Sequence, residues 1–332
     1  MLLNLNHRVG VLTAMAALSL CAPAVAATPS FPAKPITLMV PYPAGGTSDA
    51  LARALAKTMA AELGQPVIVE NLGGASGAIA ARKVLNLPAD GYYIYVGSPN
   101  ELILAPLVIG SAKFTSEEFR MVQKVGDLTL AVLSRGDLPV ANVDELAQYA
   151  AQRAKSGHPL TYGSVGVGSL YHLLGEKFSQ SIGTPLLHVP YKGGTPMTLD
   201  LVGGQIDLFL GALGTNSAGF IRDKKIKMLA VVSPERSAEF QNVPATADAK
   251  SLKDYSYSLW VGLLVKKDTP EPVVNTLRQA ITAALRDSAL KTSAESANVI
   301  VAKPQSLSQA QDDYSRSVAQ YRSIAKSISL QP

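Results

Sequence analysis

The strongest indication of the fold is the stretch ITLMVPYPAGGTSD at residues 36–49. Its first five residues, Ile36 to Val40, predict a short buried strand that Pro41 ends. The glycines and hydroxyl residues that follow predict a loop. Apolar residues spaced four apart from Leu51 to Met59 then predict a helix that reaches about residue 62. A strand that leads through a glycine-rich loop into a helix is typical of α/β proteins.

The same unit recurs further along the chain. A strand at 160–162 is followed by a loop from Gly163 to Ser169 and a helix at 170–180, and a strand at 186–189 is followed by a loop from Tyr191 to Thr195. Further strand candidates lie at 67–69, 93–96, 206–210 and 228–232, and a further helix at 78–85. Repeated units of this kind predict parallel-rich sheets flanked by helices.

Two apolar segments, 128–133 and 259–265, interrupt this rhythm. We interpret each as a strand that crosses between two lobes. Lobe 1 is then expected at 28–126 plus 262–332, and lobe 2 at 127–261. The polar, helix-like stretch from residue 306 is expected to pack on the outside of lobe 1.

Residues 1–27 have the pattern of a signal peptide. A weakly basic start precedes an apolar run at 9–21, and small residues allow cleavage after Ala26 or Ala27. A lipoprotein would instead carry its lipid on Cys21, but Leu20 is too bulky for that cleavage. Cys21 is the only cysteine, so the mature chain is expected to hold neither a disulfide nor a thiolate metal site.

Charge and motifs exclude several classes of function. The net charge of +5 falls to about +4 without the leader, and no basic run of five residues is present, so no nucleic-acid partner is expected. The chain lacks a P-loop, and the pattern at 166–171 is an incomplete dinucleotide fingerprint, so no cofactor is expected. No pair of the four histidines has the spacing of a helical metal site, and we expect no bound metal.

The loops at 44–49, 163–169 and 191–195 share one design, in which glycines with Ser or Thr precede a helix. Unpaired backbone N–H groups at a helix N-terminus suit a carboxylate or a phosphate. The same residues also suit any ordinary turn, so both interpretations stay open. Asp49 either stabilises the first turn of its helix or contacts the solute. A hydrolase that uses Ser164 or Ser169 with His172 is a third possibility, although no motif supports it.

Several of these stretches resemble one known family, the substrate-binding proteins of tripartite tricarboxylate transporters, also called the Bug family. The matching segments cover most of the mature chain in order and spacing. They lie at 34–49, 63–71, 89–92, 162–169, 188–194, 203–207 and 232–236.

The resemblance implies a periplasmic Venus-flytrap protein of type II-like topology that grips a small organic carboxylate between the loops at 42–49 and 163–169. It implies no catalytic residue and no enzyme activity. Glycines 193 and 194 and Gln205 are expected to be structural. The binding roles that the resemblance implies fall on Tyr42, Ala44, Gly46, Thr47, Asp49, Ser98, Ser164, Gly168, Ser169 and Tyr191.

The chain departs from the family pattern in loops that are expected to line the distal half of the cleft. No acid follows the segment at 203–207, where the sequence reads Phe209-Leu210-Gly211-Ala212, and Ser98-Pro99-Asn100-Glu101 is unusual. The solute therefore stays open among di- and tricarboxylates, acidic amino acids and aromatic acids. We expect a monomer whose partner is a membrane permease, or alternatively a sensor.

Overall fold

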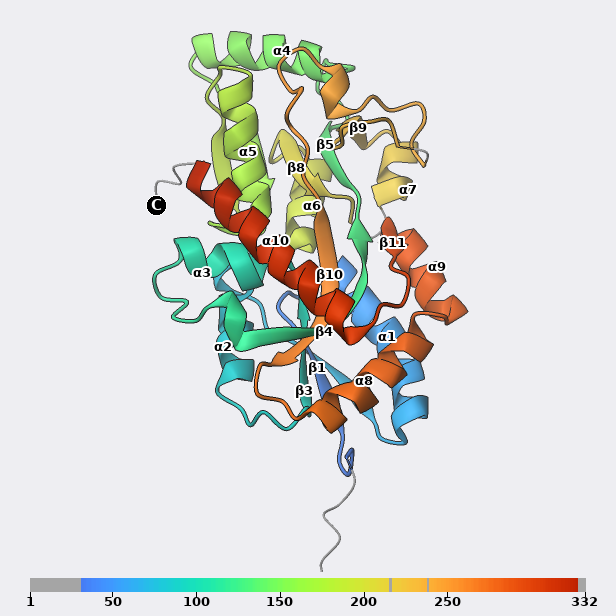
Figure 1. The fold of residues 1–332 in the computed structure, drawn as a ribbon. Helices are drawn as coiled ribbons and strands as arrows, with labels where there is room; N and C mark the ends of the chain where they lie inside the picture. Colours follow the sequence, from blue (N-terminus) through green and yellow to red (C-terminus); the bar gives the residue numbers. More distant parts are fainter. Residues whose placement is uncertain (1–30, 215–216, 238, 328–332) are drawn as a thin grey trace, which may run out of the picture.

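The computed structural model describes residues 31–214, 217–237 and 239–327. The predicted signal peptide and its cleavage site lie outside these residues. The chain forms two lobes, one above the other, each built on its own sheet with helices on both sides (Figure 1). The expected two-lobed α/β fold is therefore confirmed.

The lobe 1 sheet has six strands in the order β11-β4-β10-β3-β1-β2. Strands β3, β1 and β2 are parallel, whereas β10, β4 and β11 pair antiparallel. The sheet is thus mixed, with its parallel part confined to the N-terminal units. The strand bounds are β1 Ile36–Val40, β2 Val67–Asn71, β3 Tyr93–Gly97, β4 Phe119–Leu128, β10 Leu259–Lys266 and β11 Val299–Val301.

The lobe 2 sheet has five strands in the order β7-β6-β8-β5-β9. Here β7, β6 and β8 are parallel, and β5 is antiparallel to β8 and β9. The two sheets thus share one feature. In each, a strand from another part of the chain pairs antiparallel with the third strand of the parallel set: β10 pairs with β3 in lobe 1, and β5 pairs with β8 in lobe 2. The bounds are β5 Leu130–Arg135, β6 Thr161–Ser164, β7 Leu187–Pro190, β8 Leu208–Ala212 and β9 Ile226–Val231.

Helix α1 (Thr47–Leu63) shows how the apolar pattern becomes packing. Its stripe of Leu51, Leu55 and Met59 is fully buried against the sheet, and Gly64 ends the helix in the left-handed conformation (φ 62°). The other helices are α2 Ala78–Leu85, α3 Ala105–Val108, α4 Val143–Lys155, α5 Leu170–Ser181, α6 Gly194–Val202, α7 Ser217–Arg222, α8 Glu271–Ala284, α9 Ser288–Ser296 and α10 Leu307–Ser327. Helix α10 packs against β4 of lobe 1 (Figure 1). This is the position that we expected for the polar, helix-like stretch from residue 306.

The two segments interpreted as crossing strands agree with that expectation only in part. The run at 128–133 carries the chain from lobe 1 to lobe 2 as expected, but it is not one strand, because β4 ends at Leu128 and β5 begins at Leu130 in the other sheet. The run at 259–265 does not cross, because β10 pairs with β4 and β3 along its length. Its unbroken apolar sequence reflects burial on both faces of a central strand. The chain returns to lobe 1 between β9 and β10.

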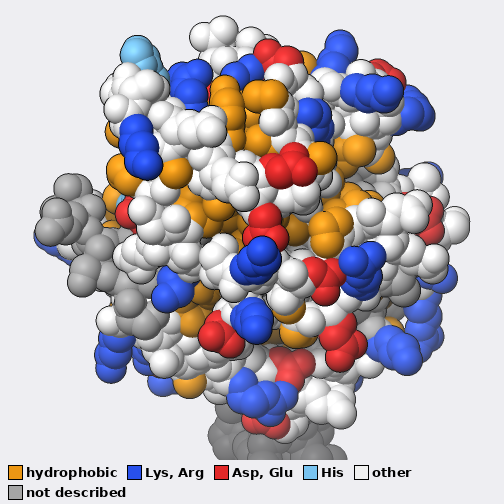
Figure 2. Space-filling model, turned by 90° about the horizontal axis from the view of Figure 1, so that it is seen from above, with side chains coloured by type: hydrophobic (Ala, Val, Ile, Leu, Met, Phe, Trp, Pro, Cys, Tyr) orange, Lys and Arg blue, Asp and Glu red, His pale blue; other side chains and the backbone are white. Residues whose placement is uncertain are grey.

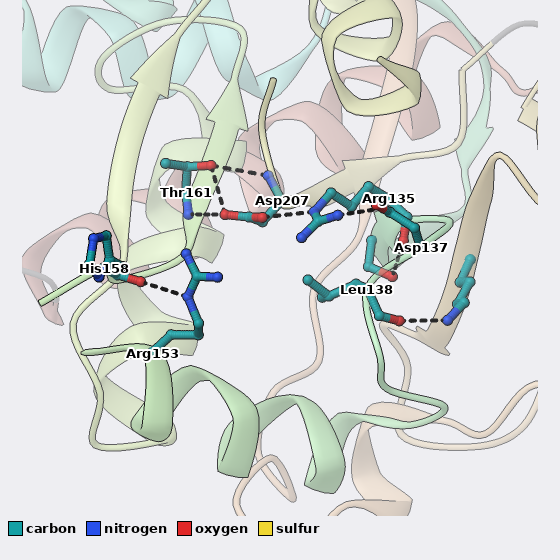
Figure 3. A network of polar contacts seen from close by, with 9 residues as sticks. Arg135, Asp137, Leu138, Arg153, His158, Thr161 and Asp207 are labelled. Atoms are coloured by element: carbon teal, nitrogen blue, oxygen red, sulfur yellow. Dashed lines mark hydrogen bonds and ion pairs between the residues drawn. The ribbon is translucent and has the colours of Figure 1, made fainter. Parts of the chain in front are cut away.

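An ionic network of partly exposed side chains joins the strands of lobe 2 at the end of the sheet where β6 begins (Figure 3). The carboxylate of Asp207 accepts hydrogen bonds from Thr161 N (2.9 Å) and Thr161 Oγ1 (3.1 Å) and from Arg135 Nε (2.9 Å). Arg135 also pairs with Asp137 at 2.5 Å. The Asp207 of the 203–207 segment therefore ties β5 to the start of β6 and lies far from the surface that faces lobe 1.

No helix in the described part of the chain is long and apolar enough to cross a membrane. On the face of the molecule in Figure 2, Lys and Arg side chains are interspersed with Asp and Glu. That face therefore carries charges of both signs.

Candidate functional site

A cavity of about 190 Å³ lies between the two lobes. On the lobe 1 side its wall contains Tyr42, the loop from Pro43 to Ser48 except Ala44, Ser98 and Asn100. On the lobe 2 side it contains the beginning of α6, from Gly194 to Leu199 except Pro196, together with residues of β8, α5 and α7. None of the described residues that line it is an Asp, Glu, Lys, Arg or His. Any charge on a bound solute must therefore be stabilised by dipoles and hydrogen bonds.

The N-terminus of α1 opens into this cavity without a side-chain cap. Gly46 is the N-cap residue, with φ −87°, and Thr47 begins the helix. Asp49 lies outside the cavity wall and accepts hydrogen bonds from Gly45 N (2.9 Å) and Arg53 Nε (3.0 Å). Burial acts to raise the pKa of Asp49, but these hydrogen bonds outweigh it, and the pKa is lowered. Asp49 thus holds the loop in shape, which supports the first-turn alternative.

The N-terminus of α6 approaches the same cavity from lobe 2. Its N-cap residue, Gly193, also lacks a side-chain cap. A Cβ atom on Gly46 would lie 3.8 Å from Thr195 Oγ1, and one on Gly193 would lie only 2.8 Å from Pro43 Cδ. The two glycine-rich loops therefore lie in contact, and two helix N-termini without side-chain caps lie at the wall of the cavity.

The loop at 163–169 was expected to face the loop at 42–49. Two of its N–H groups instead form hydrogen bonds within lobe 2. Gly166 N donates to Ser164 Oγ (3.1 Å), and Gly168 N donates to His172 Nδ1 (3.2 Å). Ser169 Oγ caps α5 by accepting from His172 N (3.3 Å). Of this loop only Val165 lines the cavity. The loop that faces 42–49 is the one that begins α6.

Contacts between the lobes hold the 163–169 loop against lobe 1. Asn100 Oδ1 accepts from Leu170 N at 2.7 Å, and Ser76 Oγ donates to Val167 O at 2.7 Å. Asn100 therefore occupies the N-terminus of α5, where an anion would otherwise bind. Ser76 belongs to the glycine-rich turn η1 (Ala75–Gly77), so this turn forms part of the contact between lobes.

The residues predicted to bind the solute thus divide into two groups. Four of them line the cavity, namely Tyr42, Gly46, Thr47 and Ser98. Six are not among its lining residues, namely Ala44, Asp49, Ser164, Gly168, Ser169 and Tyr191. Tyr191 borders a neighbouring pocket and donates from its hydroxyl to Asp200 at 2.7 Å.

A buried carboxyl that sequence reasoning did not assign lies directly behind the cavity. Glu101, in the π-helical turn η2 (Asn100–Leu104), has no exposed surface and accepts from Tyr42 Oη (2.9 Å) and Ser98 Oγ (2.9 Å). Burial raises the pKa of Glu101 to about 7. The hydroxyl of Tyr42 is engaged by Glu101, so Tyr42 presents its ring to the cavity. The signals in the sequence were one acid placed directly before an apolar run and the unusual stretch Ser98-Pro99-Asn100-Glu101 that contains it.

The serine–histidine arrangement differs from the one that a hydrolase with His172 requires. Ser164 Oγ lies 2.6 Å from His188 Nε2, and the His188 ring stacks on His172 with centroids 4.0 Å apart. Burial, with the neighbouring His172, lowers the pKa of His188 to about 4. Ser164 is fully buried and does not line the cavity. Neither Ser164 nor Ser169 is bonded to the ring of His172. The described residues also contain no cluster of three metal-ligating side chains.

Two lobes of this topology, closed around an uncharged cavity between helix N-termini, define a two-lobed solute-binding protein. The family described as "Tripartite tricarboxylate transporter family receptor" matches residues 51–329. The chain belongs to this family, as its motifs indicated, and the family is one of receptors.

Relatives agree with this assignment. The protein BugT of Bordetella pertussis is 31% identical over 283 residues, which cover 83% of this chain and 84% of BugT. The periplasmic binding protein BugD has a similar structure, with a TM-score of 0.83 and 30% identity over 91% of this chain and 99% of BugD. MatC of Rhodopseudomonas palustris, solved with bound malate, gives a TM-score of 0.81 and 26% identity over 89% of this chain and 100% of MatC.

Proposed function

We propose that the chain captures a small organic carboxylate between its lobes in the periplasm and delivers it to a membrane permease of the tripartite tricarboxylate type. The observation that carries this proposal is the pair of uncapped helix N-termini, α1 and α6, at one cavity. Two helix dipoles and several unpaired N–H groups can stabilise a carboxylate without a cationic side chain.

The proposed contacts for the carboxylate combine both loops. The backbone of Gly46 to Ser48 and the hydroxyl of Thr195 hold its oxygens, and Ser98 with the ring of Tyr42 completes the wall at that end of the cavity. Closure would occur by hinge motion at Thr129, between β4 and β5, and in the segment before β10. The malate bound by MatC supports a carboxylate as the solute class.

A binding experiment on the mature chain tests the proposal. Thermal unfolding would be followed with aliphatic, aromatic and hydroxy acids, each compared with the corresponding uncharged alcohol. At least one acid should raise the melting temperature in a concentration-dependent way while its alcohol does not. The absence of stabilisation by any acid would contradict the proposal. N-terminal sequencing of the secreted protein would test cleavage after Ala26 or Ala27, and solute uptake in a strain that lacks the gene would test delivery.

A further inference from the structure

The wall of the cavity has a polar part and an apolar part. Hydroxyl, amide and backbone groups come from the start of α1, from Ser98 with Asn100, and from the start of α6. Helix α6 also contributes the apolar Met197 and Leu199, but a larger apolar group lies beside the hinge, and its members are Leu128, Tyr171, Phe209, Ala212, Phe220 and Leu259. This group, called the apolar end below, suits hydrocarbon, whereas the starts of α1 and α6 suit a carboxylate.

The apolar end is firmly built. The rings of Phe209 and Tyr171 meet edge to face with centroids 5.1 Å apart, and both side chains are buried. Leu259 is paired with Leu128 in the lobe 1 sheet, and Ala212 is paired with Leu130 in the lobe 2 sheet. Because these strands pair in sheets and carry apolar side chains, this end offers a second carboxylate few hydrogen-bond donors. A charge moved there from water would lose its hydration without replacement.

The same argument excludes an ammonium group on the solute. No acidic side chain is among the described residues that line the cavity. Glu101, which lies behind the wall, is engaged by Tyr42 and Ser98. An amino acid would therefore bring a cation without a counter-ion.

We propose that the solute is a monocarboxylic acid with an uncharged, apolar body, such as a six-carbon chain or a benzene ring, and not a dicarboxylate or an amino acid. This inference rests on the proposed function and narrows it. The size agrees, because an apolar cavity of about 150 Å³ is large enough for benzene, and this one has about 190 Å³.

Isothermal titration of the mature chain with matched acids tests the inference. Hexanoate is compared with adipate, and 3-phenylpropanoate with phenylalanine, because each pair differs only in the added charged group. The monocarboxylates should bind at least about tenfold more tightly. Adipate or phenylalanine binding as tightly as its partner would overturn the inference and leave the proposed function intact. Acids binding no better than hexanol would contradict the proposed function itself.

A variant that adds a cation to the apolar end supplies the second test. Phe220 lies on α7 and is only partly buried, so Phe220→Arg should fold, which thermal unfolding would verify. It should reverse the preference so that adipate binds more tightly than hexanoate. The matched control, Ala218→Arg, adds the same charge to an exposed position of α7 and should keep the preference for hexanoate. An unchanged preference in the folded arginine variant would overturn the assignment of this end.

Discussion

Glu101 is the residue whose environment departs most from what its type prefers. It is a fully buried carboxyl whose pKa burial raises from 4.5 to about 7. The native state therefore binds a proton more tightly than the unfolded state between these values. This group's contribution to stability is fully present below about pH 4.5 and is lost as the pH rises through 7. A shift of this size corresponds to about 3 kcal/mol.

We therefore predict that the unmodified protein loses stability as the pH rises from 5 to 7.5 and that Glu101→Gln removes this loss. The amide keeps the shape of the side chain and a hydrogen-bonding group for Tyr42 and Ser98 but cannot ionise. Melting temperatures of both proteins across this range measure the effect as a difference. Glu62→Gln, at an exposed position of α1, is the control and should leave the profile unchanged. Parallel profiles for Glu101→Gln and the unmodified protein would refute this account of Glu101.

His188 should influence stability in the opposite sense. Its pKa is lowered to about 4, so the native state binds fewer protons than the unfolded state from about pH 6.5 down to pH 4. Stability from this group is present above pH 6.5 and is lost on acidification. His188→Gln should reduce the fall in melting temperature between pH 7 and pH 5 while keeping a partner for Ser164. The control, His158→Gln, changes an exposed histidine and should leave this fall in melting temperature unchanged. Equal acid sensitivity in the unmodified protein and both variants would show that His188 does not contribute.

At the scale of single residues, only part of the candidate site between the lobes could be predicted from the sequence. Tyr42, Gly46, Thr47 and Ser98 could be found because they stand in loops whose glycines and hydroxyls have a recognisable pattern. Asn100 could not be assigned, because its role depends on Leu170, a residue 70 positions away in the other lobe. Capping by a side chain from another lobe leaves no local signal.

At the scale of elements, the contact between η1 and the 163–169 loop should contribute to closure. Ser76→Ala removes the hydroxyl that donates to Val167 O and leaves the cavity wall unchanged. A net hydrogen bond is worth about 0.5–1.5 kcal/mol, so the dissociation constant of the solute should rise by about 2- to 12-fold. Titration calorimetry measures this rise.

Ser116→Ala provides the matched control. Its hydroxyl donates to Leu102 O at 2.9 Å within lobe 1, so it should lower the melting temperature without changing affinity. Equal affinity in the Ser76 variant and the unmodified protein would mean that this contact is irrelevant to closure.

The approach of the two glycine-rich loops is a second feature of the elements. Gly193 has an extended backbone (φ 174°), so a larger residue is not strained there by its own conformation. Its Cβ would nevertheless meet Pro43 in the closed state. Gly193→Val should therefore hold the lobes apart and weaken solute binding about tenfold or more, with little change in the melting temperature of the solute-free protein. Gly110→Ala, where a Cβ meets nothing within 4 Å, is the control.

The elements themselves were largely predictable, and their pairing was not. Strand β1 and helix α2 have the predicted bounds because proline, glycine and apolar periodicity mark their ends. The run at 128–133 was correctly expected to cross between the lobes but wrongly interpreted as one strand, because β4 and β5 are both apolar there and a single residue, Thr129, separates them. The run at 259–265 looks the same whether a strand crosses between sheets or lies in the middle of one.

At the scale of the whole molecule, the two lobes meet through hydrogen bonds and close glycine contacts around one cavity. The loop at 163–169 was expected to be the lobe 2 half of the carboxylate site. Its Gly166 and Gly168 N–H groups are satisfied within the protein, and we propose that the start of α6 takes that place. Which loop faces which follows from how the lobes dock, and local sequence does not encode that directly.

The most direct test of the central claim is a crystal structure of the mature chain with its acid bound. The carboxylate is predicted to lie between the N-termini of α1 and α6, within hydrogen-bonding distance of the backbone at Gly46 to Ser48 and of Thr195 Oγ1. The rest of the solute should point toward Phe209 and Leu259. A carboxylate bound instead at the 163–169 loop, or an acid outside the cavity between the lobes, would contradict the account.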